Sequence, residues 1–394
     1  MDSIVRRILQ LSDPEIALSK KVSLSQNELI VNSYRFQFQK PLILAIGKAS
    51  VKMANFFLSK LNKYESLVVK PRGDNLKLNG NAEVIESSHP YPDESSFEAG
   101  KKVREYLLNK EYDLVILLLS GGASSLVEDP IPPKHVYVDI MKKLITSGIG
   151  IEEVNIVRKH LSKIKGGRLA SLSKSKIVTL VVSDVPGNDL STVGSGPTHA
   201  DLSTVHEARE IMRWLNLQGE EYLEETPKKL DNVWEFLILD VSEVLRGLNL
   251  ENSYILSSEV RGEAKSFGAF LASLMNTRYI PFRRPFTLLF GGEPEVHLSG
   301  KVGKGGRNGE VCLSFLEWVR DEKFKLYAIA TDGIDGNSDY AGCVVDGKTK
   351  LSKLEIRRSL EEHSSYQLLE RTKSTVKTGP TGTNVNNIYV LIAP

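Results

Sequence analysis

Cysteines and long apolar runs are scarce in this sequence, and both absences exclude classes of protein. Cys312 and Cys343 are its two cysteines, so the chain has no disulfide framework and no cysteine zinc site, and a reducing interior is the default environment. No apolar run approaches the roughly 20 residues of a membrane span, and residues 1–7 lack a secretory apolar segment. We therefore expect a cytoplasmic protein that does not bind a membrane.

A surplus of charge of one sign is also missing, because 51 Lys and Arg residues face 49 Asp and Glu residues, for a net charge of +2. Nucleic-acid-binding proteins usually concentrate positive charge well beyond this balance, so we expect small anions as partners and no nucleic acid. With 41% hydrophobic residues among 394, the chain is globular and long enough for two domains. Polar stretches at 216–240 and 248–253 place the predicted boundary between residues 1–245 and 246–394.

Apolar β-branched runs, each followed by a helical pattern, indicate the fold class. Because the runs do not alternate with polar residues, they are typical of central strands in a parallel sheet with helices on both faces. We predict two α/β domains, of which the N-terminal one has a Rossmann-like three-layer α/β/α sheet. The predicted strands are 42–46, 114–119, 177–182, 288–290 and 326–330, and the predicted helices are 50–61, 94–108, 136–145, 151–164, 205–215, 263–274 and 309–320.

The first two strand ends carry residues suited to anions, at the edge where α/β sheets bind ligands. Lys48 stands at a helix start, where its charge adds to the positive helix end and costs stability unless an anion binds; a solvated surface lysine is the alternative. The second end is a stretch of glycines and hydroxyls with the composition of an anion nest, although a tight structural turn would also use the glycines. It is neither a GxxxxGK[ST] loop nor GxGxxG. Its candidate residues are Ser120, Gly121, Gly122 and Ser124.

A long Gly/Pro loop follows the third strand. Asp184 and Asp189 in this loop could hold Mg²⁺ or accept a proton, or they could form turns and helix caps. Ser195 and Gly196 lie further along the same loop. About fifteen residues of loop inside a compact domain favour a binding function.

The last two strand ends are also polar. Glu293 follows the fourth run, and a Gly-rich segment then opens a helix at Arg307 and Asn308, where an arginine is suited to bidentate recognition of carboxylate or phosphate. The fifth end carries Asp332 and Asp335 in a segment that superficially looks like an EF-hand loop. It follows a strand and lacks the EF-hand spacing, so that interpretation fails.

Two further residues lie outside the strand ends. Arg158 belongs to a basic helix end. Most positive charges at such an end are explained by their favourable interaction with the helix dipole. His89 sits in a Pro-rich turn, where a structural hydrogen bond and proton transfer both remain open.

Taken in order, these motifs resemble the glycerate 2-kinase family, whose C-terminal module is called MOFRL. The resemblance covers nearly the whole chain. It implies ATP-dependent phosphorylation of the 2-hydroxyl of D-glycerate, with Mg²⁺, to give 2-phosphoglycerate and ADP. The segments that carry it are AIGKA (45–49), HPYPDESS (89–96), LLSGGASSL (118–126), VRKHLSKIKGGRLA (157–170), SDVPGNDLSTVGSGPT (183–198), FGGEPEV (290–296), GKGGRNGE (303–310), ATDGIDGNSDYAG (330–342) and TGPTGTNVNN (378–387).

The chain departs from the family pattern at four positions, which could alter the metal preference or the choice of phosphate donor and leave the core assignment intact. Ala123, Asn188, Pro294 and Gly309 stand where the family usually has Gly, Asp, Thr and Gln. The matching positions look like the family's polar cleft; they are Lys48, Asp184, Asp189, Glu293, Arg307, Asp332 and Asp335.

From the residues and the resemblance together we assign roles. Lys48, Asp189 and Arg307 are the expected catalytic residues, and Asp184 and Asp189 are the expected metal ligands. Because Lys48 and the nest precede the predicted boundary whereas Arg307 follows it, we expect the active site in the cleft between the domains. The residues expected to bind substrate or nucleotide are Ser120, Gly121, Gly122, Ser124, Arg158, Asp184, Ser195, Gly196, Glu293, Asn308, Asp332 and Asp335.

Two other functions stay open at this point. A dehydrogenase of the hydroxypyruvate reductase type would need a GxGxxG finger and an acidic ribose reader, and neither occurs. A sensor of sugar-acid phosphates would explain the nests but not the acidic residues at the strand ends. The sequence leaves a homodimer open, and the 2-position of phosphorylation rests on the resemblance alone.

Overall fold

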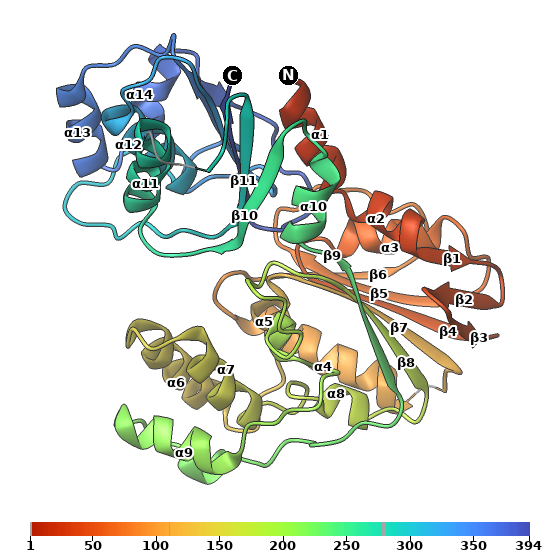
Figure 1. Cartoon of the computed structure of the whole chain (residues 1–394). Helices are drawn as coiled ribbons and strands as arrows, with labels where there is room; N and C mark the ends of the chain where they lie inside the picture. Colours follow the sequence, from red (N-terminus) through yellow and green to blue (C-terminus); the bar gives the residue numbers. More distant parts are fainter. Residues whose placement is uncertain (1, 110, 278–280) are drawn as a thin grey trace. The chain divides into compact units, whose positions relative to one another are not determined.

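The structure is a computed structural model that describes residues 2–109, 111–277 and 281–394 (Figure 1). The chain forms two compact units. The N-terminal unit is Pro14–Ile238, and the C-terminal unit combines Leu239–Pro394 with the first residues of the chain up to Asp13. The predicted boundary at residue 245 lies inside helix α10 (Val241–Leu248).

The N-terminal unit is built on a six-stranded sheet in the order β6-β5-β4-β7-β8-β9. The four pairings from β6 to β8 are parallel, which confirms the predicted α/β class. Leu42 and Leu44 pack against Val103 on one face, and the alternate buried residues Ile43 and Ala45 point to the other. The strands are β4 (Pro41–Ile46), β5 (Glu65–Pro71), β6 (Glu83–Ser87), β7 (Leu114–Ser120), β8 (Lys176–Val182) and β9 (Val233–Leu239).

Helices cover both faces of this sheet, as Figure 1 shows. Helix α3 contacts β4, β5 and β7, while residues of α4, α5 and α8 join the core on the opposite face. A small antiparallel sheet precedes β4. The helices are α2 (Pro14–Lys21), α3 (Ser50–Leu58), α4 (Glu94–Asn109), α5 (Ala123–Leu126), α6 (Lys134–Thr146), α7 (Ile151–His160), α8 (Arg168–Ser171) and α9 (Val205–Trp214), and the small sheet is β1 (Val22–Leu24), β2 (Glu28–Val31) and β3 (Tyr34–Gln37).

The C-terminal unit contains a mixed six-stranded sheet in the order β10-β11-β15-β12-β13-β14. The predicted strands are present, but among the strands that the structure describes here β10 and β11 alone pair in parallel, and the other pairings are antiparallel. The parallel interpretation was therefore wrong here. Its strands are β10 (Ser253–Val260), β11 (Phe286–Gly292), β12 (Lys325–Ala330), β13 (Gly342–Asp346), β14 (Thr375–Val376) and β15 (Asn387–Ala393).

The central strands β11, β12 and β15 are apolar because both faces of the sheet are covered there, whatever the strand direction. Leu288 and Phe290 belong to the core formed with α11 and α12. Gly291 follows Phe290 in β11 and points to the opposite face of the sheet, where a Cβ would lie 2.2 Å from Val241 of α10. The remaining helices of this unit are α1 (Ser3–Leu11), α11 (Ala264–Asn276), α12 (Arg307–Trp318), α13 (Lys353–Glu361) and α14 (Ser365–Arg371).

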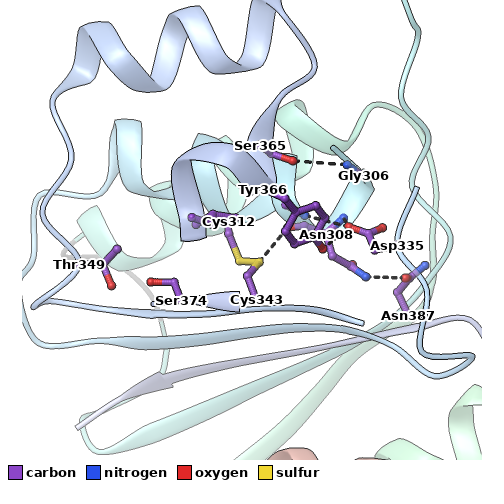
Figure 2. The surroundings of a disulfide bond; sticks show 12 residues. Gly306, Asn308, Cys312, Asp335, Cys343, Thr349, Ser365, Tyr366, Ser374 and Asn387 are labelled. Atoms are coloured by element: carbon purple, nitrogen blue, oxygen red, sulfur yellow. Dashed lines mark hydrogen bonds between the residues drawn. A yellow bond between two sulfur atoms is a disulfide. The ribbon is translucent and has the colours of Figure 1, made fainter. Parts of the chain in front are cut away.

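The two cysteines form a disulfide, which corrects the expectation drawn from their scarcity. Cys312 on α12 and Cys343 on β13 are both fully buried, and a 2.07 Å S–S bond joins them (Figure 2). They are 31 residues apart in sequence, and only the packing of α12 on β13 brings them together. A cysteine count without the fold could not show this pairing.

Candidate active site

Lys48 lies where the ends of two central strands meet. Its backbone N–H donates to the carbonyl of Gly121 (2.9 Å), and the next N–H, of Ala49, donates to Ser120 Oγ (3.0 Å). Gly47 has φ +126°, and a Cβ there would lie 2.2 Å from Ser120 Oγ, so this turn requires glycine. The end of β4 is thereby joined to the end of β7, and Lys48 stands beside the predicted nest.

The nest adopts a conformation that brings Asp184 against it. Gly122 has φ +84°, and a Cβ at Gly121 would lie 1.9 Å from Asp184 Oδ2. Asp184 follows β8, the neighbour of β7 in the sheet. Lys48, the two glycines and Asp184 are therefore brought together as the sequence predicted, while their roles stay predictions.

Hydrogen bonds connect the nest to polar side chains beside it. The hydroxyls of Ser124 and Ser195 are 2.9 Å apart, and Ser195 Oγ donates to Asn155 Oδ1 at 2.9 Å. Arg158 Nη1 donates to the same Asn155 oxygen at 3.1 Å. Ser195 is fully buried with φ +60° and contacts Ser124, while its predicted role in ligand binding stays a prediction. Sequence reasoning missed Asn155, whose signal is its i, i+3 spacing from Arg158 on one helix face.

A cavity of about 190 Å³ opens beside this chain of contacts. It combines polar groups with an apolar wall, as ligand sites commonly do. Tyr137 in its lining donates to the buried carboxylate of Glu128, and burial raises the pKa of Tyr137 well above 10. The residues lining the cavity are His89, Pro90, Pro92, Gly122, Ser124, Ser125, Tyr137, Met141, Ile145, Ile151 and Arg158.

Two predicted residues of the long loop have local structural contacts. Asp189 is exposed, and its carboxylate accepts from the backbone N–H (2.9 Å) and the hydroxyl (2.8 Å) of Ser191, which is the turn-forming geometry considered as the alternative. Gly196 has φ +59° and accepts from the N–H of Gly167 at 2.8 Å. Gly196 thus joins the loop to the segment before α8.

In the C-terminal unit, Asp335 caps helix α12. It is 1% exposed, and its Oδ2 accepts from the N–H groups of Asn308 (2.9 Å) and Gly309 (3.1 Å) and from the Tyr366 hydroxyl (2.5 Å). Figure 2 shows Asp335 and Tyr366 at the start of this helix. Burial raises the pKa of Asp335 despite these donors. Such burial suits holding the helix start more than contacting a ligand, and sequence reasoning missed Tyr366.

Arg307 is the first residue of α12 and remains partly exposed. Its Nη1 donates to Glu293 Oε1 at 2.6 Å, with 32% and 44% of the two side chains exposed. Desolvation lowers the pKa of Arg307, but Glu293 outweighs it and the pKa is raised. Asn308 is buried and donates through Nδ2 to Asn387 Oδ1 (2.8 Å). The pair Arg307–Glu293 is therefore the accessible part of this helix start.

Asp332 is half-buried and stabilises its own loop. Its Oδ1 accepts from the N–H of Ile334 at 3.1 Å, and its carbonyl accepts from Thr381 at 3.1 Å. A cavity of about 280 Å³ borders Arg307 and also the buried pair of Glu310 and His363, which sequence reasoning missed because neither residue follows a strand.

Two further features concern metal ligation and membrane insertion in residues 2–109, 111–277 and 281–394. That part of the chain contains no cluster of three His, Cys, Asp or Glu side chains arranged to hold a metal ion. None of its helices combines the length and the apolar character needed to cross a bilayer.

The chain matches known families and proteins over almost its full length. Residues 1–229 match a family described as a domain of unknown function (DUF4147), and residues 286–387 match the MOFRL family. A protein of Sulfurisphaera tokodaii named glycerate 2-kinase is 53% identical over 99% of both chains. An Agrobacterium vitis protein named putative hydroxypyruvate reductase is 36% identical over 89% of this chain and 98% of its own. The crystal structure of a Thermotoga maritima glycerate kinase superimposes with a TM-score of 0.88 at 33% identity, covering 99% of this chain and 98% of that one. The two α/β units, their sequence motifs and these full-length matches agree, and the chain belongs to the glycerate 2-kinase family.

Proposed function

We propose that this enzyme transfers the γ-phosphoryl group of ATP to the 2-hydroxyl of D-glycerate, giving 2-phosphoglycerate and ADP. The observation that carries the proposal is the meeting of Lys48 with the nest of Gly121 and Gly122 and with Asp184. A cation, a glycine-rich turn and a carboxylate gather there at the carboxyl ends of parallel strands, where α/β sheets bind ligands. The name of the Sulfurisphaera relative supports glycerate as the acceptor.

Phosphoryl transfer asks a protein mainly to position the reactants and to neutralise charge on the phosphate oxygens. Lys48 would contact the transferring phosphoryl group, and the N–H groups of Gly121 and Gly122 with the hydroxyl of Ser124 would hold the neighbouring oxygens. Arg307, oriented by Glu293, is suited to the carboxylate of glycerate. That both sets of residues serve one reaction stays a prediction.

The Asp184 carboxylate fits the preference of Mg²⁺ for hard oxygen ligands, and it lies against the nest. Mg²⁺ often keeps several waters and uses one or two carboxylates with substrate phosphates, so the residues present are compatible with it. Asp184 is the residue that would hold the ion, and Asp189 is the weaker candidate because Ser191 already occupies both its carboxylate oxygens. When bound, the ion would neutralise charge on the nucleotide phosphates.

The test is an assay of the full chain with ATP, Mg²⁺ and D-glycerate. We expect ADP formation that stops with EDTA and returns with Mg²⁺, and ³¹P NMR of the product should show 2-phosphoglycerate. Formation of 3-phosphoglycerate would contradict the position, and ADP formation without glycerate would contradict the acceptor.

Hydroxypyruvate reduction is the second candidate function, because one relative is named putative hydroxypyruvate reductase. Hydroxypyruvate with NADH or NADPH should give no oxidation of the nicotinamide, since no GxGxxG finger occurs in the sequence. Rapid oxidation that depends on hydroxypyruvate would favour the reductase.

A further inference from the structure

His89 lines the 190 Å³ cavity together with Gly122 and Ser124 of the nest. The cavity and its lining belong entirely to the N-terminal unit. Its polar lining includes Ser124 and the cation Arg158. The cavity thus offers room and polar partners for a small hydroxy acid directly beside the proposed phosphate site.

The imidazole of His89 and the side chain of Lys48 both lie close to Gly122. A Cβ at Gly122 would lie 3.0 Å from His89 Cδ2, 3.2 Å from His89 Nε2 and 3.4 Å from Lys48 Cγ. Glycine at this position therefore leaves the space in which the imidazole edge and the lysine side chain approach each other.

No hydrogen bond to the His89 ring is present among the described residues. The ring nitrogens of a histidine with a structural role usually form hydrogen bonds to other groups of the protein. The structural explanation that the sequence left open therefore has no support here, and His89 is an exposed residue that lines the cavity.

The groups around His89 favour its neutral form. Desolvation lowers its pKa, the charge of Lys48 adds to this, and the pKa falls to about 4. The other charged or titratable groups that line the cavity are Arg158, a cation, and Tyr137, whose pKa is raised so that it stays neutral. At pH 7 the ring is neutral and keeps one nitrogen lone pair that can accept a proton.

Resting on the proposed function, we propose that His89 is a catalytic residue that accepts the proton of the glycerate hydroxyl during phosphoryl transfer. The hydroxyl O–H bond breaks, its oxygen forms the new bond to the γ-phosphorus, the bond from that phosphorus to the bridging oxygen breaks, and ADP leaves with that electron pair. The proton passes to the imidazole lone pair and then to water, since His89 is an exposed residue. Asp189 is less suited, because both of its carboxylate oxygens already accept from Ser191.

The first experiment compares His89→Gln with wild type. A positioned general base contributes about 10²–10⁴-fold, so we expect kcat to fall at least 100-fold. His206→Gln is the matched control, because His206 is exposed on α9 and 3.7 Å from Glu210, and it should keep the wild-type kcat. A change in KM for glycerate with unchanged kcat would reduce His89 to a binding group and overturn the proposal.

The second experiment tests proton transfer directly. Removing the ring in His89→Ala leaves space in the lining of the cavity, so added imidazole should restore part of kcat, and substituted imidazoles of higher pKa should restore more. A structural role predicts no such dependence. Loss of activity in both variants without rescue by imidazole would also overturn the proton-accepting role.

The wild-type control separates this inference from the proposed function. If wild type forms ADP with D-glycerate and His89→Gln does so equally fast, the proton-accepting role of His89 fails and the proposed function stands. If wild type itself forms no phosphoglycerate, the proposed function fails, and the inference that rests on it falls with it.

Discussion

At the scale of single residues, the Lys48 side chain is the first to remove. Because its charge would act on the transferring phosphoryl group, Lys48→Ala should lower kcat by about 100-fold or more, the effect of one preorganised donor at a transition state. Steady-state kinetics with ATP and D-glycerate measure this. Lys63→Ala removes the same charge from an exposed site and serves as the control. A Lys48→Ala variant that keeps most of its kcat would return Lys48 to the solvated-surface explanation.

A second residue-scale prediction concerns His199, which ties the long loop to β9. Its Nδ1 lies 2.6 Å from Glu235 Oε2, and this hydrogen bond raises its pKa above the usual 6.5. A raised folded-state pKa means that the stabilisation is fully present below the unfolded pKa of about 6.5 and is lost as the pH rises through the folded value. Urea unfolding of wild type and His199→Gln should therefore differ more at pH 6 than at pH 9. An equal difference at both values would show that the pair contributes nothing through its charge.

At the scale of the element, helix α12 depends on one buried carboxylate. Tyr366→Phe removes a single donor to Asp335, and hydrogen bonds to charged groups contribute about 1.5–3 kcal/mol, so the free energy of unfolding should fall by that amount. Tyr340 stacks on Tyr366 with ring centroids 5.0 Å apart and donates to Glu370 at an exposed site. Tyr340→Phe should cost less than about 1 kcal/mol. Equal losses for the two variants would mean that the cap is not the stabilising contact.

The disulfide between α12 and β13 gives a second test at this scale. A cross-link over 31 residues should stabilise the fold by about 2–4 kcal/mol, chiefly by restricting the unfolded chain. The double variant Cys312→Ala and Cys343→Ala should unfold at lower urea concentration than oxidised wild type. A reducing agent should then lower the stability of wild type but not of the variant. If the reducing agent affects neither protein, the cysteines are not paired in solution.

The elements also show how far sequence reasoning reached. Apolar runs ending in Gly, Ser or Asp predicted the central strands. They also predicted that Lys48, Gly121 and Asp184 lie at one sheet edge, because parallel strands place their carboxyl ends together. The same pattern could not give strand direction in the C-terminal unit, since burial on both faces makes an antiparallel strand equally apolar. It also could not separate Asp335, whose Oδ2 accepts from the N–H groups at the start of α12, from Asp184, because both follow strands.

At the scale of the whole molecule, the C-terminal unit is discontinuous in sequence. Helix α1 packs on α10, where a Cβ at Gly247 would lie 2.7 Å from Leu11. Arg7 donates to the Gly247 carbonyl (3.0 Å), and Asp2 accepts from Lys325 at 2.8 Å. A fragment of residues 239–394 should therefore melt at a lower temperature than the same fragment mixed with a peptide of residues 2–13. An unchanged melting temperature would mean that α1 adds no stability to this unit.

The same packing has a consequence for biosynthesis. The ribosome makes α1 well before α10, on which α1 packs and which follows only at Val241–Leu248. At about 5–20 residues per second, the nascent helix waits on the order of 10–50 s with Val5 and Ile8, both buried in the finished protein, still uncovered. During translation, the N-terminal unit can complete its core before α10 is made, so a helix that is synthesised early reaches its native neighbours late.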